Sequence, residues 1–233
     1  MGSQMSHNLA LYAENKGLPK VQVWNRTRAK IEDTAKESYF EISDTIEQLV
    51  QKCDIIHACL ANDEVALSVY RQVLATGKPN LILVDHSTLF PTTSSLIASE
   101  AVDKDCYFLS CPVFGPPAAA KSASLIVVLS GNQTACATVQ EYIVPTIGKA
   151  LIQCGPDTSK GALLKILGNN CILGTIELLS ESFTLAEKSG FDTGLFYDFI
   201  RTYKNGIMSQ ALLTAMIRAS IPRRRMDKLW QED

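Results

Sequence analysis

The sequence predicts an α/β fold in which a doubly wound, mostly parallel sheet is followed by an all-helical second domain. Short β-prone runs alternate with helical segments over the first part of the 233 residues. From about Thr158 to Lys188 this alternation stops, and a long helical stretch follows that is apolar on too many faces for a surface helix. This change from alternating strands and helices to a long helix predicts a domain boundary near Gly155–Asp157, with domains at residues 1–156 and 157–233.

The expected elements follow from local patterns, taken in chain order. An amphipathic helix begins directly at Met1, with no strand ahead of it. The run VQVWN (21–25) follows a Gly-Leu-Pro turn and predicts a buried strand. Alternation continues to residue 154, so the strands are expected to be mostly parallel. Further helices are expected at 42–52, 62–75, 91–102 and 134–147, and further strands at 54–60, 80–85, 106–113, 125–131 and 150–154.

Charge and composition favour a protein that binds a small molecule. The formal net charge of −2 gives no general attraction to nucleic acid or to an anionic membrane. No apolar run approaches the roughly 18 to 20 residues needed to cross a bilayer, and no signal-peptide layout is present, so we expect a cytoplasmic protein without a membrane partner. The run Arg223–Arg225 is interpreted as a solvated tail, with a site for an anionic partner as the alternative.

Cysteine and histidine spacing predicts no metal site. The seven cysteines are an odd number without a C-x-x-C pair, which indicates free, mostly buried thiols. The three histidines (His7, His57 and His86) are not spaced to share a metal ion.

The N-terminal segment has the spacing of a nucleotide-binding unit without its beginning. In such a unit, a glycine-rich turn between a strand and a helix holds a pyrophosphate at the helix N-terminus. If Gly2 is the last glycine of G-x-G-x-x-G, the first strand and two glycines would precede Met1. Asn25 then follows at close to the roughly 20 residues expected for the residue that reads the ribose, although an unrelated helix and strand would give the same spacing.

The residues after the second strand favour NADP over NAD. NAD recognition uses a carboxylate on the ribose hydroxyl, but this chain has Asn25, Arg26 and Thr27 there. A guanidinium can bind a 2′-phosphate in a bidentate fork. The alternative is that Arg26 is a solvated loop residue.

Two further strand ends and one helix carry candidate ligand contacts. Leu60 and Thr88 follow predicted strands, at the sheet edge where α/β proteins bind ligands, whereas Asn62 is better explained as a helix cap. Lys165 and Asn169 are four residues apart, on one face of an otherwise apolar helix. Burial would lower the pKa of Lys165 toward the range useful for acid–base catalysis, and the alternative is a lysine whose ammonium reaches water.

Taken together, these residues resemble the β-hydroxyacid dehydrogenase family, which contains 3-hydroxyisobutyrate dehydrogenase and, more distantly, 6-phosphogluconate dehydrogenase. The resemblance runs from Met1 to about Ile207. It rests on five motifs in the family's order: Met1-Gly2, VWNRT (23–27), DHSTLFP (85–91), CPVFGPPAAAKSASL (111–125) and KGALLKILGNN (160–170).

The resemblance implies a Rossmann-type cofactor domain and a helical domain that completes the cleft and commonly forms a homodimer. It implies that Met1 and Gly2 end the phosphate loop and that Arg26 favours NADP. It further implies the roles of the other candidates: Leu60 and Thr88 would line the nicotinamide ribose, Lys165 would be the acid–base group, and Asn169 would hold the substrate.

The chain departs from the family at the loop that binds the substrate carboxylate. The commonest family form is P-V-S-G-G, and here Phe114, Gly115 and Pro116 follow Pro-Val. Phe114 supplies no hydroxyl and Pro116 no N–H, which predicts a bulkier or more apolar substrate than a simple 3-hydroxy acid.

Both ends also differ from the family, which predicts an incomplete cofactor domain and an incomplete helical domain. The first strand and two glycines are expected to be missing, and after Ser209 the sequence no longer resembles the family. Loss of a central strand and of helical segments would expose apolar surface. The alternative function is therefore a catalytically impaired relative that acts as a binding or regulatory module, and a nucleic-acid-binding module has only the arginine run in its favour.

Overall fold

The computed structural model describes residues 1–36 and 39–206, so Arg223–Arg225 and the sequence after Ser209 lie outside the described residues. Contacts divide the chain into a first unit, Met1–Asn170, and a second unit that begins at Cys171. This division falls within helix α8 (Thr158–Lys188), and the domain boundary near Gly155–Asp157 stays a prediction. The first turns of α8 belong to the first unit because the carbonyl oxygen of Thr158 accepts hydrogen bonds from the hydroxyls of Ser94 (3.1 Å) and Ser130 (3.3 Å).

The N-terminal part contains a small sheet of its own. The predicted first helix is α1 (Gly2–Asn15), and the predicted strand after it is β1 (Val21–Val23). Two elements that the sequence patterns did not indicate follow, α2 (Ala29–Lys36) and β2 (Phe40–Ile42). β2 pairs with β1 in parallel to form a two-stranded sheet.

The middle of the first unit has the predicted alternation of strands and helices. Its elements are α3 (Ile46–Lys52), β3 (Ile55–Ala58), α4 (Asp63–Ala75), β4 (Ile82–Asp85), α5 (Pro91–Val102) and β5 (Tyr107–Ser110). The strands β3, β4 and β5 are parallel neighbours in that order. Caps fix where two helices begin, because the side chains of Thr45 and Asn62 accept hydrogen bonds from the N–H groups of Gln48 and Val65.

The last strands are mixed in direction. The expected strand 106–113 is two strands, β5 and β6 (Val113–Phe114), with Pro112 between them. A short helix, α6 (Pro117–Lys121), precedes β7 (Leu125–Gly131), which is antiparallel to both β5 and β6. After α7 (Gln133–Thr146), β8 (Gly148–Gln153) pairs with β7 in parallel.

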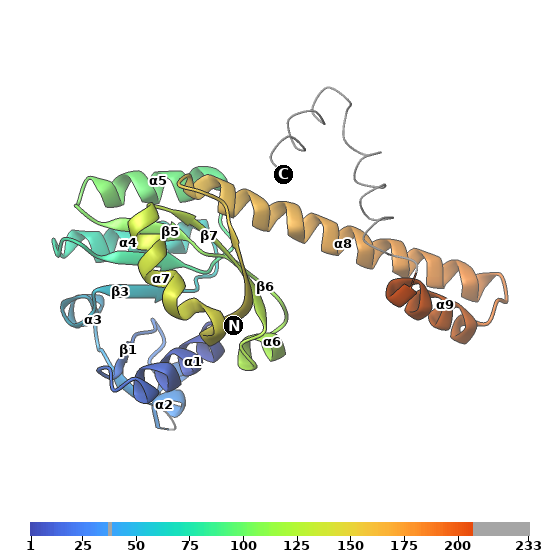
Figure 1. Cartoon of the computed structure of the whole chain (residues 1–233), viewed down its shortest axis with the longest axis horizontal. Coiled ribbons are helices and arrows are strands. Elements are labelled where there is room, and N and C mark those ends of the chain that lie inside the picture. The colour runs from blue at the N-terminus through green and yellow to red at the C-terminus, as the bar shows by residue number, and fades with distance from the viewer. Residues whose placement is uncertain (37–38, 207–233) are drawn as a thin grey trace. The chain divides into compact units, whose positions relative to one another are not determined.

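Helices cover both faces of the larger sheet, as expected for a doubly wound fold (Figure 1). Successive residues of a strand point to opposite faces. Accordingly, Leu83 and Val84 of β4 belong to two different apolar clusters. One cluster is formed with residues of α1 and α7, including Met5 and Val139, and the other with residues of α4 and α5, including Tyr70 and Ile97.

The described strands form two separate sheets where a complete nucleotide-binding unit has one. The strand order of the larger sheet is β3-β4-β5-β7-β6, with β8 paired to β7, while β1 and β2 pair only with each other among the described residues. In the order 3-2-1-4-5-6 of such units, the first strand lies between the strands that correspond to β1 and β3. The two described sheets are therefore separated at the position that the first strand occupies in such a unit.

The second unit contains the rest of α8 and helix α9 (Thr193–Gly206). The expectation that no segment is long and apolar enough to span a membrane is wrong by length and composition. Helix α8 has 31 residues and an 18-residue window of mean hydropathy 1.4, of which 6% is buried. Lys165, Asn169 and Asn170 interrupt the run in the sequence, but the average over the window stays apolar.

All seven cysteines are free thiols, as predicted. They are less buried than expected. Only Cys106 and Cys111 are buried, while Cys59 and Cys171 are exposed.

Candidate functional site

The ends of β3 and β4 are joined by a hydrogen-bond network. The N–H of Leu60, just after β3, donates to the hydroxyl of Ser87 over 2.7 Å. Ser87 in turn donates from its N–H (2.7 Å) and its hydroxyl (3.1 Å) to the carboxylate of Asp85, the last residue of β4. The hydroxyl of Tyr70 from α4 donates to the same carboxylate over 2.7 Å. The buried carboxylate of Asp85 thus positions Ser87, which in turn accepts the hydrogen bond from the main chain of Leu60, a predicted cofactor contact.

Burial dominates the electrostatics of this network. Asp85 is 2% exposed, and desolvation raises the pKa of its carboxyl to about 6 against the opposing effect of the donors from Tyr70 and Ser87. Burial, together with the nearby Asp85, also raises the pKa of Tyr70 well above its usual value. Tyr70 therefore stays protonated and acts as a hydrogen-bond donor.

The N-terminus of α1 packs closely against the end of β3. A Cβ added to Gly2 would lie 3.3 Å from the Cβ of Cys59, so a larger residue would crowd this contact. Such close packing of helix on strand is the function of the last glycine in the phosphate-binding turn. The first N–H groups of a helix of 14 residues also favour an anion at this place. The contact of Met1 and Gly2 with a phosphate stays a prediction.

The loop after β1 contains two arginines, of which Arg28 is paired and Arg26 is unpaired among the residues that the structure describes. Asn25 shapes the loop, since its side-chain oxygen accepts a hydrogen bond from the N–H of Thr27 over 2.9 Å. Arg28 is engaged by two carboxylates, Glu32 at 3.1 Å and Asp44. Arg26 is exposed and has no hydrogen bond or ion pair with any residue that the structure describes.

The remaining strand-end candidates differ in role. Asn62 caps α4, as predicted, because its side-chain oxygen accepts from the N–H of Val65 over 2.9 Å. Thr88 is exposed and hydrogen-bonds no residue in the described ranges, so its contact with a cofactor stays a prediction.

Lys165 lies against the aromatic ring of Phe114. Its Nζ atom is 4.2 Å from the ring centroid, within the range of a cation–π contact. The side chain is half-buried, and desolvation lowers its pKa below the usual value. Among the described residues it has no carboxylate partner and no hydrogen bond. Asn169, one turn further along α8, is half-buried and likewise makes no hydrogen bond in the described part of the chain.

The turn after Phe114 requires a glycine. Gly115 has φ of 137°, which side-chain-bearing residues rarely adopt, and a Cβ there would lie 2.7 Å from Cδ2 of Leu125. Pro116 follows in an extended conformation with φ of −74° and has no N–H to offer. Phe114 is half-buried and Gly115 is exposed.

The structure brings two predicted site residues from distant segments together, Lys165 and Phe114. Leu60 and Gly2 instead contact Ser87 and Cys59, which were not predicted as site residues. Sequence reasoning missed the role of Asp85, although a carboxylate at the end of a buried strand and two residues before a serine was a usable signal. It also missed the contact of Gly168 with the ring of Phe114, since nothing in the sequence distinguishes this glycine from others.

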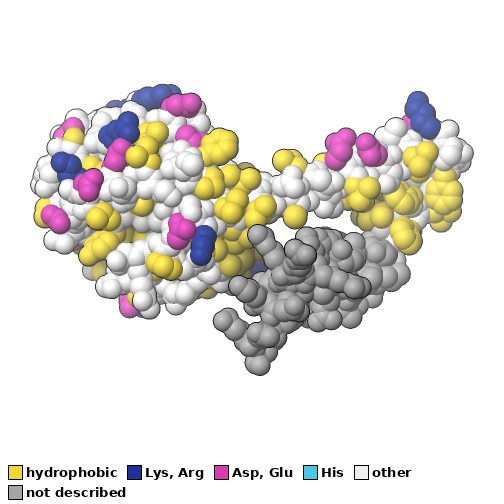
Figure 2. All heavy atoms as spheres, turned by 90° about the horizontal axis from the view of Figure 1, so that it is seen from above, with side chains coloured by type: hydrophobic (Ala, Val, Ile, Leu, Met, Phe, Trp, Pro, Cys, Tyr) yellow, Lys and Arg dark blue, Asp and Glu magenta, His cyan; other side chains and the backbone are white. Residues whose placement is uncertain are grey.

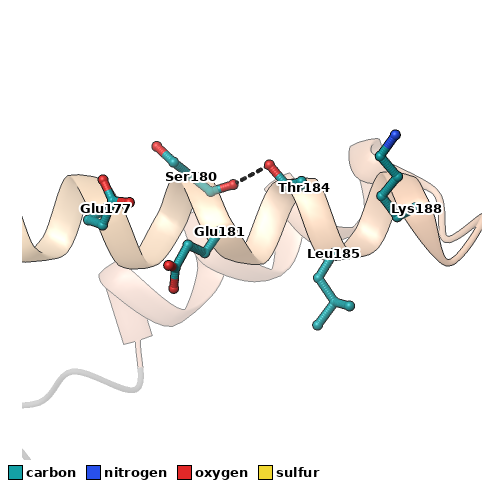
Figure 3. A pocket seen from close by; sticks show the side chains of 6 residues that line it. All are labelled: Glu177, Ser180, Glu181, Thr184, Leu185 and Lys188. Carbon is teal, nitrogen blue, oxygen red and sulfur yellow. Dashed lines mark hydrogen bonds between the residues drawn. The ribbon is translucent and has the colours of Figure 1, made fainter.

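Two shallow hollows of the described surface do not coincide with these residues. One is lined by Pro91, Thr92, Ser95, Leu96 and Ser159. The other follows α8 in the second unit, and Figure 3 shows that Glu181 and Leu185 point away from Ser180, Thr184 and Lys188. The hydroxyl of Thr184 there only donates to the carbonyl of Ser180 (2.8 Å), so this hollow does not gather its side chains around one point.

Known proteins resemble the chain in sequence and in fold. Residues 1–155 match the family described as the NAD binding domain of 6-phosphogluconate dehydrogenase. The chain is 33% identical over 194 residues to the NADH-dependent oxidoreductase ucdB of Aspergillus ustus, a match that covers 83% of this chain and 65% of that protein. It is 29% identical over 161 residues to a probable mitochondrial 3-hydroxyisobutyrate dehydrogenase of Dictyostelium discoideum, covering 67% of this chain and 49% of that protein.

Two solved structures show the same fold. The 3-hydroxyisobutyrate dehydrogenase of Mycobacterium tuberculosis, solved with L-serine, has a TM-score of 0.76 at 24% identity and covers 86% of this chain and 66% of its own. An imine reductase of Myxococcus stipitatus in complex with NADP+ has a TM-score of 0.80 at 19% identity, with coverages of 94% and 73%.

Proposed function

We propose, from the premise that this chain belongs to the β-hydroxyacid dehydrogenase family, that it transfers a hydride between a nicotinamide cofactor and a hydroxy acid or related carbonyl compound. The observation that carries the proposal is Lys165, a half-buried ammonium without a carboxylate partner among the described residues, set against the loop that faces the substrate in this family. A lysine in such a place is available to exchange a proton with a bound substrate.

Lys165 is proposed as the acid–base group. The nicotinamide, when bound, supplies or accepts the hydride. In the reductive direction the Lys165 ammonium donates a proton to the substrate carbonyl oxygen, and in the oxidative direction the neutral amine takes the hydroxyl proton. Burial lowers the pKa of Lys165 and so makes the neutral amine more accessible. Asn169, on the same face of α8, is proposed to hold the substrate beside it.

NADP is the proposed cofactor. Support comes from Arg26, whose guanidinium is exposed and unpaired in the described part of the chain, beside the polar side chains of Asn25 and Thr27. The network from Asp85 through Ser87 supports the main chain at Leu60, and Thr88 follows it at the same strand end. Met1 and Gly2 are proposed to meet the pyrophosphate.

A second candidate function is a catalytically impaired relative that binds without turnover. It is favoured by Phe114 and Pro116, which remove donors from the substrate loop. The chain spans 65% and 49% of the lengths of the two relatives compared above.

A cytoplasmic homodimer that binds a small molecule is the proposed state of the protein. The second unit exposes many large apolar side chains, among them Leu173 (65%), Leu178 (64%), Leu185 (69%) and Leu195 (61%). Figure 2 shows apolar side chains gathered at the α9 end of this unit. Contiguous apolar surface of this kind favours coverage by a partner, which we propose is a second copy.

The proposed function is tested by following oxidation of NADPH with a panel of keto acids and apolar ketones and aldehydes. Lys165→Met is expected to lower the rate about 10²- to 10⁴-fold. Lys160→Met, an exposed lysine of the same helix, is the matched control and is expected to leave the rate unchanged. Turnover by Lys165→Met at the wild-type rate would contradict the acid–base role.

A further inference from the structure

The ring of Phe114 is seated on the backbone of α8. Phe114 ends β6, which pairs with β7 so that Phe114 lies opposite Ile126. A Cβ added to Gly168 would lie 2.4 Å from Cζ and 2.5 Å from Cε1 of the Phe114 ring, closer than real Cβ atoms approach. A larger residue at position 168 would therefore require the ring of Phe114 to move.

The same ring covers the ammonium of Lys165, three residues before Gly168. The distance from Nζ to the ring centroid is 4.2 Å, and no carboxylate pairs with Lys165 in the described ranges. The aromatic face thus supplies the attraction that a carboxylate would otherwise give, because the face of an aromatic ring carries partial negative charge.

The residues around Lys165 offer few partners to a carboxylate on the substrate. Phe114 has no hydrogen-bonding side-chain atom and Pro116 has no N–H. A substrate carboxylate at this loop would lose hydration without gaining these donors. An apolar or aromatic group would instead pack against the ring.

We propose that Phe114 positions Lys165 and determines substrate specificity: seated at Gly168, its ring holds the ammonium and selects carbonyl compounds with an apolar or aromatic group beside the reacting carbon over small keto or hydroxy acids. This inference rests on the proposed function, since Lys165 must be the acid–base group for the choice of substrate to matter. Phe114 itself transfers no proton and acts through Lys165 and through packing.

The seat of the ring is tested by thermal unfolding. Gly168→Ala is expected to lower the midpoint because its Cβ collides with Phe114, and adding Phe114→Ala is expected to recover the loss caused by Gly168→Ala. Gly174→Ala is the matched control, because it lies in the same helix with nothing within 4 Å of the added Cβ. Equal midpoints for Gly168→Ala and Gly174→Ala would overturn the proposed seat.

The hold on Lys165 is tested without cofactor or substrate by carbon NMR of ¹³C-labelled lysine, with the signal assigned by its loss in Lys165→Met. Phe114→Leu keeps the site apolar but removes the aromatic face, so the ammonium loses its attraction and the pKa of Lys165 is expected to fall by roughly half to one pH unit. A pKa that stays unchanged or rises in Phe114→Leu would overturn the positioning role.

Specificity is tested by kcat/KM for apolar carbonyl compounds and for small keto acids. The wild type is expected to prefer the apolar compounds, and Phe114→Ser is expected to shift the ratio toward the keto acids by about tenfold or more, since it adds a hydroxyl and removes the ring. A wild-type preference for small keto acids would overturn the inference. Failure to turn over any compound would instead overturn the proposed function, while the NMR and unfolding results still decide whether Phe114 holds Lys165.

Discussion

His57 and His86 are joined ring to ring, with Nδ1 of His57 2.9 Å from Nε2 of His86. Nδ1 of His86 lies 2.8 Å from the carbonyl oxygen of Cys111, which can only accept, so this nitrogen carries the hydrogen. Because burial lowers the pKa of both histidines and keeps their rings neutral, Nε2 of His86 accepts from Nδ1–H of His57, and Nε2 of His57, 2.8 Å from the hydroxyl of Tyr142, accepts from that hydroxyl. The chain of hydrogen bonds thus assigns one tautomer to each neutral ring.

The buried histidine pair predicts loss of stability in mild acid. Burial lowers the pKa of His86 from 6.5 to about 4, and burial and the neighbouring ring lower that of His57 well below 6.5. At pH values between the lowered folded-state pKa and the ordinary 6.5, the unfolded chain binds more protons than the folded chain. The stability of the fold therefore falls as the pH falls from about 6.5 toward 4. The contribution of His86 is on the order of 3 kcal/mol. Urea unfolding at pH 7.5 and pH 5 measures it.

A double variant, His57→Gln with His86→Asn, separates this effect from other acid effects. It is expected to be less stable than the wild type at pH 7.5 but to lose less stability on going to pH 5. The same loss in both proteins would show that the histidine pair does not cause the acid sensitivity.

The raised pKa of Asp85 predicts a dependence of stability on pH opposite to that of the histidine pair. Its folded-state pKa of about 6 exceeds the ordinary 3.8, so the folded chain binds more protons in this range and the contribution of Asp85 is lost as pH rises through 6. Asp85→Asn removes the buried charge but keeps only one acceptor oxygen, so either the Tyr70 hydroxyl, which donates to Oδ2, or the Ser87 N–H, which donates to Oδ1, loses its acceptor. In urea unfolding it is expected to be less stable than the wild type at pH 7.5, because one buried donor loses its acceptor, and to lose more stability than the wild type between pH 7.5 and pH 5.

The control for this variant is Asp85→Ala. It leaves the Tyr70 hydroxyl and the Ser87 N–H without their acceptor, which costs about 1 to 3 kcal/mol for a buried donor. If Asp85→Ala were as stable as Asp85→Asn, the network would contribute nothing to the end of β4.

The acid–base role of Lys165 predicts opposite pH limbs in the two directions of the reaction. Reduction needs the ammonium, so kcat/KM for a carbonyl substrate is expected to fall as pH rises through the lowered pKa of Lys165. Oxidation needs the amine, and its rate is expected to rise over the same range. Stopped-flow or steady-state rates across alkaline pH measure both, and a limb that persists in Lys165→Met would belong to another group.

Much of the fold was predictable because its signals are local. The bounds of α8, Thr158 to Lys188, follow from one uninterrupted helical pattern, and Asn62 identifies the start of α4 by its capping chemistry. α2 and β2 were missed because α2 is mostly polar and β2 has three residues. The antiparallel direction of β7 was not predictable from its residues, since apolar alternation does not say which neighbour a strand pairs with.

The candidate site likewise contains residues that local patterns predict and contacts that they do not predict. Lys165 was predictable as a charge within an apolar helix, and Arg26 as a guanidinium where a carboxylate was expected. The contact of Phe114 with Lys165 and Gly168 joins segments far apart in the sequence, and so does the hydrogen bond from Leu60 to Ser87. Such contacts depend on the folded sheet and no local pattern reveals them.

The most direct test of the account is a titration of NADPH and of NADH into the purified chain, followed by nicotinamide fluorescence. The matched variants are Arg26→Ala and Arg28→Ala, because Arg28 lies in the same loop but is paired with Glu32 and Asp44. The account predicts that the wild type binds NADPH more tightly than NADH and that Arg26→Ala weakens NADPH binding about 10-fold or more, as expected for loss of a charged hydrogen bond, with NADH binding and the Arg28→Ala variant little changed. Absence of binding of either nucleotide to the folded chain, or NADPH binding that survives Arg26→Ala intact, would contradict it.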